Sequence, residues 1–318
     1  MVCPLCGNNK KVLVYNKLRG NNKFKLDLCS SCGLYYLNPF PTKKEINSFY
    51  GANYYYDSYV NDGVFAKKSL LFFESIKKYL PKKGISLDVG CSKGFLAYFF
   101  KRNGFDAYGI DLSKNACVYA KKIGVKAFPL DLLSFNFNKK FDVITLIDLL
   151  EHVDNPIKLL KKANSLLNDN GVIIISTPNI KSFYSKLSKD NWVGFDLPFH
   201  LTYFSKDSIL FALKNAGFDN NLVTTDSFNL ISIEGLLRTN LNFFFGKILD
   251  YVGLRKSFRK TFMLPDVKLK ASNKIINLDI SINFGDVLKK LINFPLNLVS
   301  NHLLLGDQLL SISKKTIK

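Results

Sequence analysis

Apolar and polar residues form a repeating pattern from residue 84 onward. Short apolar runs, which predict buried strands, alternate with stretches in which apolar residues recur every three or four positions, which predict helices. The predicted strands span residues 87–89, 107–110, 125–130, 141–147, 172–176, 222–226 and 306–314. The predicted helices between them span residues 95–103, 114–122 and 159–167. Strands that alternate with helices are typical of a doubly wound α/β fold with a mostly parallel sheet.

The same pattern divides the chain into five parts. Residues 1–50 hold four closely spaced cysteines, and residues 51–83 are a linker that contains a predicted helix. The core spans residues 84–232, and residues 301–318 supply its last strand. Residues 233–300 are basic, helical in pattern and inserted before that strand. This insertion could be a lid over the substrate, a dimer face, a membrane-surface patch for a lipid-linked substrate or a plain packing subdomain.

A glycine-rich turn joins the first predicted strand of the core to the helix that follows. Gly90 lets the backbone approach a ligand closely, and Gly94 lets the helix begin tight against the strand. Asp111 ends the second strand, 21 residues after Gly90. An acid at this place can accept hydrogen bonds from two ribose hydroxyls. Because doubly wound sheets bind ligands at the carboxyl ends of their strands, the pattern predicts a nucleoside site.

Four segments then occur in order: LDVGCSKGF, YGIDLS, FDVITLIDLLEHVDNP and LLNDNGVIIISTPN. They resemble the motifs of class I S-adenosylmethionine-dependent methyltransferases, with Ser92 where motif I often has its middle glycine. The resemblance implies a Rossmann-like sheet of seven strands whose last strand is antiparallel, and S-adenosylmethionine as the cofactor. The residues that it assigns to cofactor binding are Asp88, Gly90, Cys91, Gly94, Asp111, Leu112, Asp131, Leu132 and Asp148.

A further resemblance covers WVGFDLPFHLTYFSKDSILFALKNAGF, residues 192–218. It is similar to the sequence after the fifth strand in a subgroup of these methyltransferases that has an N-terminal cysteine module. Members of that subgroup act in surface-glycan pathways. The resemblance therefore implies methyl transfer to a small-molecule acceptor, a sugar or a lipid-linked glycan intermediate. It covers residues 1–232 well and residues 233–300 poorly, and it does not say whether oxygen, nitrogen or carbon is methylated.

Charge is unevenly distributed along the 318 residues, whose net charge is +20. Residues 1–86 carry +9 and residues 233–318 carry +8, whereas residues 87–232 carry only +3. Basic flanks fit nucleic acid or an anionic membrane surface, but only five of the 45 basic residues are arginine, which fits a purely compositional bias equally well. The N-terminus lacks the apolar run of a signal peptide. We expect a cytoplasmic protein, which could also contact a membrane surface through the insertion at residues 233–300.

Two C-x2-C pairs, Cys3 with Cys6 and Cys29 with Cys32, lie 22 residues apart. Each pair precedes a glycine, which is typical of a knuckle whose two thiolates face one point. Four thiolates predict a closed, tetrahedral, structural Zn²⁺ site. Two disulfides or four free thiols are the alternatives, and a reducing cytoplasm disfavours the disulfides.

Two of the three histidines fall where cofactor and acceptor would meet. His152 follows the fourth strand and His200 follows the fifth, so both face the same end of the sheet. Either could be the general base for an acceptor hydroxyl, or could instead make a hydrogen bond that fixes its local turn. Asp148 and Glu151 could bind a metal with a hydroxylated substrate, although two acids alone do not define a site.

Other functions stay open at this point. The basic zinc module and flanks could serve an RNA methyltransferase, although the Asn/Asp-Pro-Pro-aromatic motif for base amino groups is missing after the fourth strand. A non-catalytic nucleoside-binding adaptor would need no base, but the intact cofactor motif argues against it. A nicotinamide oxidoreductase is disfavoured by Ser92 and by the absence of a Tyr-x-x-x-Lys pair near the fifth strand.

Overall fold

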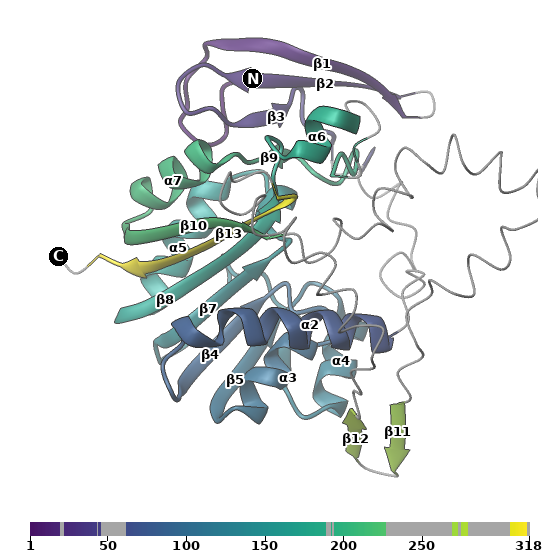
Figure 1. The fold of residues 1–318 in the computed structure, drawn as a ribbon, viewed down its shortest axis with the longest axis vertical. Helices are drawn as coiled ribbons and strands as arrows, with labels where there is room; N and C mark the ends of the chain where they lie inside the picture. The colour runs from purple at the N-terminus through teal and green to yellow at the C-terminus, as the bar shows by residue number, and fades with distance from the viewer. Residues whose placement is uncertain are drawn as a thin grey trace, which may run out of the picture.

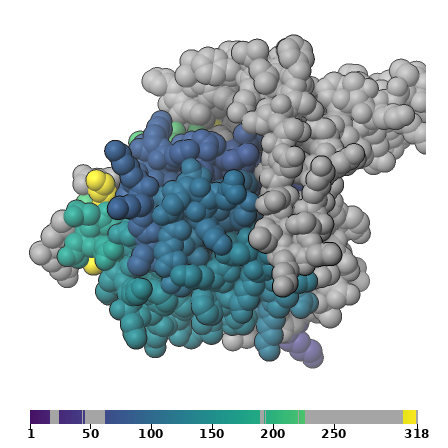
Figure 2. Space-filling model, turned by 90° about the horizontal axis from the view of Figure 1, so that it is seen from below, coloured from purple at the N-terminus to yellow at the C-terminus, as the bar shows by residue number. Residues whose placement is uncertain are grey.

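The computed structural model describes residues 1–19, 22–42, 44–45, 62–188, 192, 194–226, 269–272, 275–278 and 306–316. Two units are evident in Figure 1: a small sheet near the N-terminus and a larger α/β unit beside it. Viewed from below in Figure 2, the blue and teal residues of the larger unit form one continuous packed surface.

Within the described residues, seven strands form the central sheet in the order β10-β13-β8-β7-β4-β5-β6. Their bounds are β4 (Gly84–Val89), β5 (Phe105–Ile110), β6 (Lys126–Phe128), β7 (Phe141–Ile147), β8 (Leu167–Pro178), β10 (Phe218–Asp226) and β13 (Gln308–Lys315). β13 runs antiparallel to β8 and β10, and the other neighbours are parallel. The predicted fold class, a mostly parallel sheet with one antiparallel final strand, is confirmed.

Helices cover both faces of this sheet (Figure 1). They are α2 (Asp62–Ile76), η1 (Lys77–Tyr79), α3 (Phe95–Arg102), α4 (Lys114–Lys122), η2 (Leu150–His152), α5 (Pro156–Leu166) and α7 (Lys206–Asn215). On one face, Phe73 of α2 and Phe100 of α3 pack in the same cluster as Ile174. On the other, Leu160 of α5 packs in a cluster with Ile175. Successive strand residues point to opposite faces, and both faces of β8 are covered by helices. Its buried residues 172–175 are therefore all apolar.

The small sheet joins two distant parts of the chain, in the order β1-β2-β3-β9. Its strands are β1 (Lys11–Arg19), β2 (Asn22–Cys29), β3 (Tyr35–Leu37) and β9 (Thr202–Tyr203), which follows α6 (Phe183–Ser188). Tyr35 pairs with Tyr203, and the Leu37 N–H donates to the Leu201 carbonyl at 2.9 Å. The cysteine module is therefore tied by backbone hydrogen bonds to the segment that follows β8.

Several element boundaries differ from the predictions, and two of the differences have a clear physical reason. Helix α5 begins earlier, at Pro156, because the Asn155 side chain caps it by accepting a hydrogen bond from the Lys158 N–H at 3.0 Å. Strand β8 begins at Leu167, so residues 168–171, predicted to end the helix, belong to a strand. Their asparagine and glycine residues are typical of turns, which hid this strand.

The predicted helical insertion at residues 233–300 lies outside the described residues, apart from two short strands. These are β11 (Leu269–Ser272) and β12 (Ile275–Leu278), which pair antiparallel. For these residues the helical prediction is wrong, and the adjacent β-branched Ile275 and Ile276 favour a strand. In the described part of the chain, no helix has the length and apolar character needed to cross a membrane.

Candidate functional site

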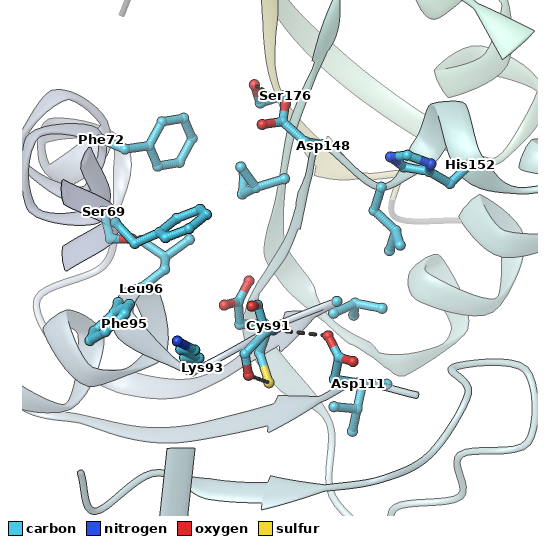
Figure 3. Close-up of a pocket in the computed structure, with 18 of the residues that line it drawn as sticks. Ser69, Phe72, Cys91, Lys93, Phe95, Leu96, Asp111, Asp148, His152 and Ser176 are labelled. Atoms are coloured by element: carbon cyan, nitrogen blue, oxygen red, sulfur yellow. Dashed lines mark hydrogen bonds between the residues drawn. The ribbon is translucent and has the colours of Figure 1, made fainter. Parts of the chain in front are cut away.

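A cavity of about 900 Å³ lies at the carboxyl ends of β4, β5 and β7. The strand order reverses at this point, because β5 and β7 lie on opposite sides of β4. Doubly wound sheets bind their ligands in such a crevice. Figure 3 shows Phe72 of α2 pointing into the space that also receives Asp111 and Asp148. The volume lies within the range of small-molecule sites, about 300–1,000 Å³.

The turn after β4 forms one wall of the cavity. The N–H groups of Gly90 and Cys91 donate to the Ile110 carbonyl at 2.8 and 3.0 Å, and Gly90 has a φ of 72°. Ser92 is also left-handed, with a φ of 47°, a conformation that costs a non-glycine residue about 1–2 kcal/mol. Its N–H donates to the Asp111 carboxylate at 2.9 Å. This hydrogen bond helps serine to keep a turn that suits glycine.

Asp111 is held in place by two backbone N–H groups. Its Oδ2 accepts from Ser92 at 2.9 Å, and its Oδ1 accepts from Ser113 at 2.8 Å. Because a carboxylate can accept about four hydrogen bonds, about two acceptor positions remain. Asp111 lines the cavity, where those positions suit the two hydroxyls of a ribose.

Gly94 differs from the other residues predicted to bind the cofactor, because it does not line the cavity. It is the N-cap of α3, with a φ of 79°. A Cβ added here would lie 2.6 Å from the Cβ of Ala120 in α4. The glycine therefore shapes the turn and lets α3 lie close to α4.

Gly94→Ala should lower the free energy of unfolding by about 2–4 kcal/mol, since overpacking costs about 1–3 kcal/mol and the left-handed backbone about 1–2 kcal/mol. Urea denaturation measures this loss. Gly104→Ala is the matched control, because Gly104 has a φ of 88° but no atom within 4 Å of an added Cβ. Equal losses in the two variants would show that crowding against Ala120 is not the reason for Gly94.

Asp88, Leu112, Asp131 and Leu132, also predicted to bind the cofactor, all line the cavity. Leu112 is 78% exposed and offers a flat ligand an apolar surface. Asp88 is buried and accepts a hydrogen bond from Thr145 Oγ1 at 2.7 Å, and burial raises its pKa to about 7. These residues line the β4–β6 side of the cavity.

A second polar group lies across the cavity from Asp111 (Figure 3). Asp148 follows β7 with a φ of 49°, and strained positions of this kind concentrate at functional sites. Ser176 Oγ lies 3.4 Å from Asp148 Oδ1 and 3.5 Å from Gln308 Oε1. The Asp148 side chain is exposed to the open cavity, yet the cavity wall takes away part of the hydration of its carboxyl. This partial desolvation raises its pKa to about 6, although the charge of Lys68 opposes the rise.

The two predicted histidines lie together, but only His152 lines the cavity. The buried His200 ring packs edge to face against it, with 4.6 Å between ring centroids. Nδ1 of His152 lies 3.0 Å from the Phe199 carbonyl, and Nδ1 of His200 lies 2.8 Å from the Gly194 carbonyl. Burial lowers the pKa of each ring to about 4, so both rings are neutral at pH 7.

Glu151 lies beside this histidine pair and is almost completely buried. Its Oε2 accepts a hydrogen bond from Thr177 Oγ1 at 3.0 Å, whereas Oε1 has no hydrogen-bond partner among the described residues. Burial raises the pKa of this carboxyl well above its ordinary value. One carboxylate oxygen and one nitrogen from each of His152 and His200 lie within 4.8 Å of one another.

The four N-terminal cysteines converge, as their spacing predicts. The Sγ atoms of Cys3 and Cys32 are 3.5 Å apart, as are those of Cys6 and Cys29. All four Sγ atoms lie within 4.8 Å of one another, and none of these cysteines forms a disulfide. A tetrahedral zinc site with Zn–S bonds of about 2.3 Å has S···S distances of about 3.8 Å. The cluster therefore fits Zn²⁺.

Part of the cavity could not be found by sequence reasoning. Ser176 carried a weak signal, because it is a polar residue at the end of an apolar strand. Gln308 carried none, because its place depends on the antiparallel pairing that sets it opposite Pro178. The contribution of α2 through Phe65 and Phe72 depends on how that helix packs against the turn.

Comparison with known proteins identifies the region that builds the cavity. A family model described as a methyltransferase domain matches residues 56–223, more than half of the chain. The chain belongs to this methyltransferase domain family. The matched region of the methyltransferase runs from the segment before α2 into β10, so it includes Asp111, Asp148 and His152 but neither the cysteine cluster nor β13.

Individual relatives cover the methyltransferase to different extents. An uncharacterized protein of Methanocaldococcus jannaschii is 27% identical over 177 residues, 55% of this chain and 83% of that protein. A ubiquinone biosynthesis O-methyltransferase of Psychrobacter cryohalolentis is 34% identical over 103 residues, 29% of this chain and 40% of that enzyme. Its counterpart in Pelagibacter ubique is 31% identical over 166 residues, 45% of this chain and 68% of that enzyme.

Among solved structures, the fold is similar to that of an S-adenosylmethionine-dependent methyltransferase of Thermotoga maritima. It is 16% identical, with a TM-score of 0.47, and the match covers 86% of this chain and 97% of that one. The sequence match to the Psychrobacter ubiquinone biosynthesis O-methyltransferase spans less than half of that enzyme's length. The acceptor of that enzyme is therefore not assigned to this methyltransferase.

Proposed function

We propose that this methyltransferase transfers the methyl group of S-adenosylmethionine to a hydroxyl group of a sugar or lipid-linked sugar. The observation that carries the proposal is a single cavity of about 900 Å³ with two separate polar ends. Asp111 lies at one end, and Asp148 lies at the other with Ser176 and Gln308. A cavity of this size can hold a nucleoside cofactor and a small acceptor side by side.

The residues of the β4–β6 side fit the cofactor. Asp111 offers acceptor positions to a ribose diol, and the exposed side chain of Leu112 offers an apolar surface to adenine. Asp131 lines the same side and can accept from the adenine amino group. The bound cofactor would supply an activated methyl group, and these residues would hold its nucleoside so that the β7 side stays free for an acceptor.

The β7 side fits an acceptor that carries hydroxyl groups. Asp148, Ser176 and Gln308 offer hydrogen-bond donors and acceptors close together. Phe72 and Phe199 line the same cavity and offer apolar surface to the face of a sugar ring. A simple phenol would fill the apolar part but leave most of the polar group without partners, which favours the sugar.

Asp148, which the resemblance assigned to cofactor binding, is instead the residue best placed to accept the proton of the acceptor hydroxyl. Its carboxyl lines the cavity, and a pKa of about 6 leaves it ionised at pH 7 while making it a stronger base than an ordinary aspartate. The acceptor oxygen would lose its proton to Asp148 as it attacks the methyl group. The geometry favours Asp148 over His200, which does not line the cavity. His152 lines the cavity, but burial lowers its pKa to about 4, so it is a weaker base than Asp148.

Asp148→Asn should lower kcat about 10²–10⁴-fold, because an amide cannot accept the proton, and should leave S-adenosylhomocysteine affinity near the wild-type value. In assays without added divalent metal ions, wild-type kcat should rise about tenfold per pH unit up to about pH 6 and then level off. The reason is that only the ionised carboxylate accepts a proton. The variant should lack this rise. Asp154→Asn, which alters an exposed carboxylate just beyond η2, is the control. Full activity in Asp148→Asn would remove Asp148 from the mechanism.

Zinc at the four cysteines is proposed as a structural ion. The cluster uses all four thiolates, which leaves no ligand position for water or substrate. The cysteines anchor the β1–β2–β3 hairpins, and β3 pairs with β9 near His200. The module would therefore support the acceptor side of the cavity rather than take part in chemistry.

The acceptor class can be tested with S-adenosylmethionine that carries a labelled methyl group. The acceptors to compare are nucleotide sugars, lipid-linked sugars, a simple catechol and structured RNA. We expect label on a sugar hydroxyl. Label on the catechol alone would replace the sugar proposal, and label on RNA with a steep salt dependence would favour the RNA alternative. Membrane contact through residues 233–300 stays a prediction, since most of that segment lies outside the described residues.

A further inference from the structure

We propose that Glu151, His152 and His200 form a binding site for a divalent transition-metal ion such as Zn²⁺ in the inner wall of the cavity. The site is separate from the four cysteines in sequence and in chemistry. Its ligands come from η2 and from the segment before β9. Binding of the ion does not depend on which acceptor the methyltransferase uses.

The first argument is the environment of Glu151. Its side chain is only 1% exposed, and a buried carboxylate is costly unless charges or hydrogen bonds compensate it. Thr177 compensates Oε2, but Oε1 has no partner among the described residues. None of the ion pairs found between described residues involves Glu151. A divalent cation would satisfy the second oxygen.

The second argument is the hydrogen bonding of the two imidazoles. Each Nδ1 lies at 2.8–3.0 Å from a backbone carbonyl, which can only accept, so Nδ1 carries the proton. In a neutral ring the lone pair is then on Nε2, where a metal ion can bind. Metal-binding histidines usually donate their other N–H to a carbonyl or carboxylate, and both His152 and His200 have this arrangement.

The third argument is distance. One nitrogen of each ring and one carboxylate oxygen lie within 4.8 Å of one another. Ligand atoms of a tetrahedral zinc ion with bonds of about 2.0–2.1 Å lie about 3.3 Å apart. Small rotations of the three side chains would therefore complete the site. Two imidazoles and one carboxylate suit zinc, iron or cobalt rather than magnesium or calcium.

Three protein ligands leave a position open on the ion, and His152 places the site at the cavity wall. If the proposed function holds, the acceptor hydroxyl would bind at that position. The ion would lower the pKa of the hydroxyl, and its proton would pass to Asp148. This arrangement also explains why neither histidine serves as the base, because the ion would occupy both Nε2 atoms.

The test is a Co²⁺ titration of the purified full-length protein, followed by calorimetry and visible absorption, without cofactor or acceptor. Cobalt at the four cysteines gives a thiolate charge-transfer band, so two sites can be told apart. We expect two tightly bound equivalents per chain, of which only one produces this band. Glu151→Gln should keep the thiolate-bound equivalent and weaken the other by more than the roughly 10–100-fold typical of a change next to the ligands. Asp154→Asn should keep both.

A wild-type protein that binds only the thiolate-bound equivalent would overturn the proposal, as would a folded Glu151→Gln variant that still binds both. In either case the cluster would be a buried network that shares a proton. If Glu151→Gln does not fold, the wild-type stoichiometry and spectrum decide alone. Because the titration needs neither S-adenosylmethionine nor acceptor, failure of methyl transfer and failure of metal binding can be distinguished.

Discussion

Asp111→Ala should weaken the binding of S-adenosylhomocysteine about 100-fold or more. The carboxylate is held by Ser92 and Ser113 with its remaining acceptor positions available to a ribose. A hydrogen bond to a charged group is worth about 1.5–3 kcal/mol, so the loss of two such bonds removes about 3 kcal/mol or more. Calorimetric titration of the variant beside the wild-type protein measures the effect.

The control for this variant is Asp106→Ala. Asp106 lies on β5, the strand that Asp111 follows, but its carboxylate pairs with Lys126 at 2.6 Å and does not line the cavity. Its loss should leave cofactor affinity unchanged. Urea denaturation checks that Asp111→Ala is folded, since the substitution also removes two hydrogen bonds from the turn. Unchanged affinity in folded Asp111→Ala would mean that the ribose binds elsewhere.

Cys29→Ser should release the zinc ion and unfold the β1–β2–β3 module. Zinc contributes about 10–16 kcal/mol of apparent free energy to small modules of this kind, far more than a short hairpin gains from packing. The effect should reach the acceptor side, because β3 pairs with β9 and the Leu201 N–H donates to the Glu151 carbonyl at 2.8 Å. Acceptor turnover should therefore collapse, while S-adenosylhomocysteine binding, which depends on β4–β6, should persist.

Three measurements test this prediction: zinc content, hydrogen exchange of the β1–β2 amides and calorimetric titration with S-adenosylhomocysteine. Cys117→Ser is the control, because Cys117 is a buried cysteine of α4 outside the cluster, and this variant should keep its zinc. Retention of zinc and of amide protection in Cys29→Ser would show that the four cysteines are not the zinc site.

The core of the fold could be predicted because its strands are buried on both faces. β7 was predicted at its observed bounds, since Phe141–Ile147 is strongly apolar apart from Asp142 and Thr145 and is framed by polar residues. Asp111 could also be predicted, because its role depends only on its place at the end of a strand after a glycine turn. Such features are local in the chain, so the pattern of the sequence carries them.

Other features depend on contacts between distant segments. β9 has only two residues, Thr202 and Tyr203, and forms because the cysteine module offers the edge of β3. No periodic pattern can signal so short a strand. The grouping of Glu151 with His200 follows from the same contact. The left-handed backbone of Asp148, which aims its carboxyl into the cavity, is likewise set by the surrounding structure rather than by residue type.

Calorimetric titration of the zinc-loaded wild-type protein with S-adenosylhomocysteine, beside NADH, tests most directly whether the cavity is a methyl-donor site. We predict binding of one S-adenosylhomocysteine per chain and none of NADH. Absence of S-adenosylhomocysteine binding by the folded protein would contradict the cofactor assignment, and with it the proposed methyl transfer.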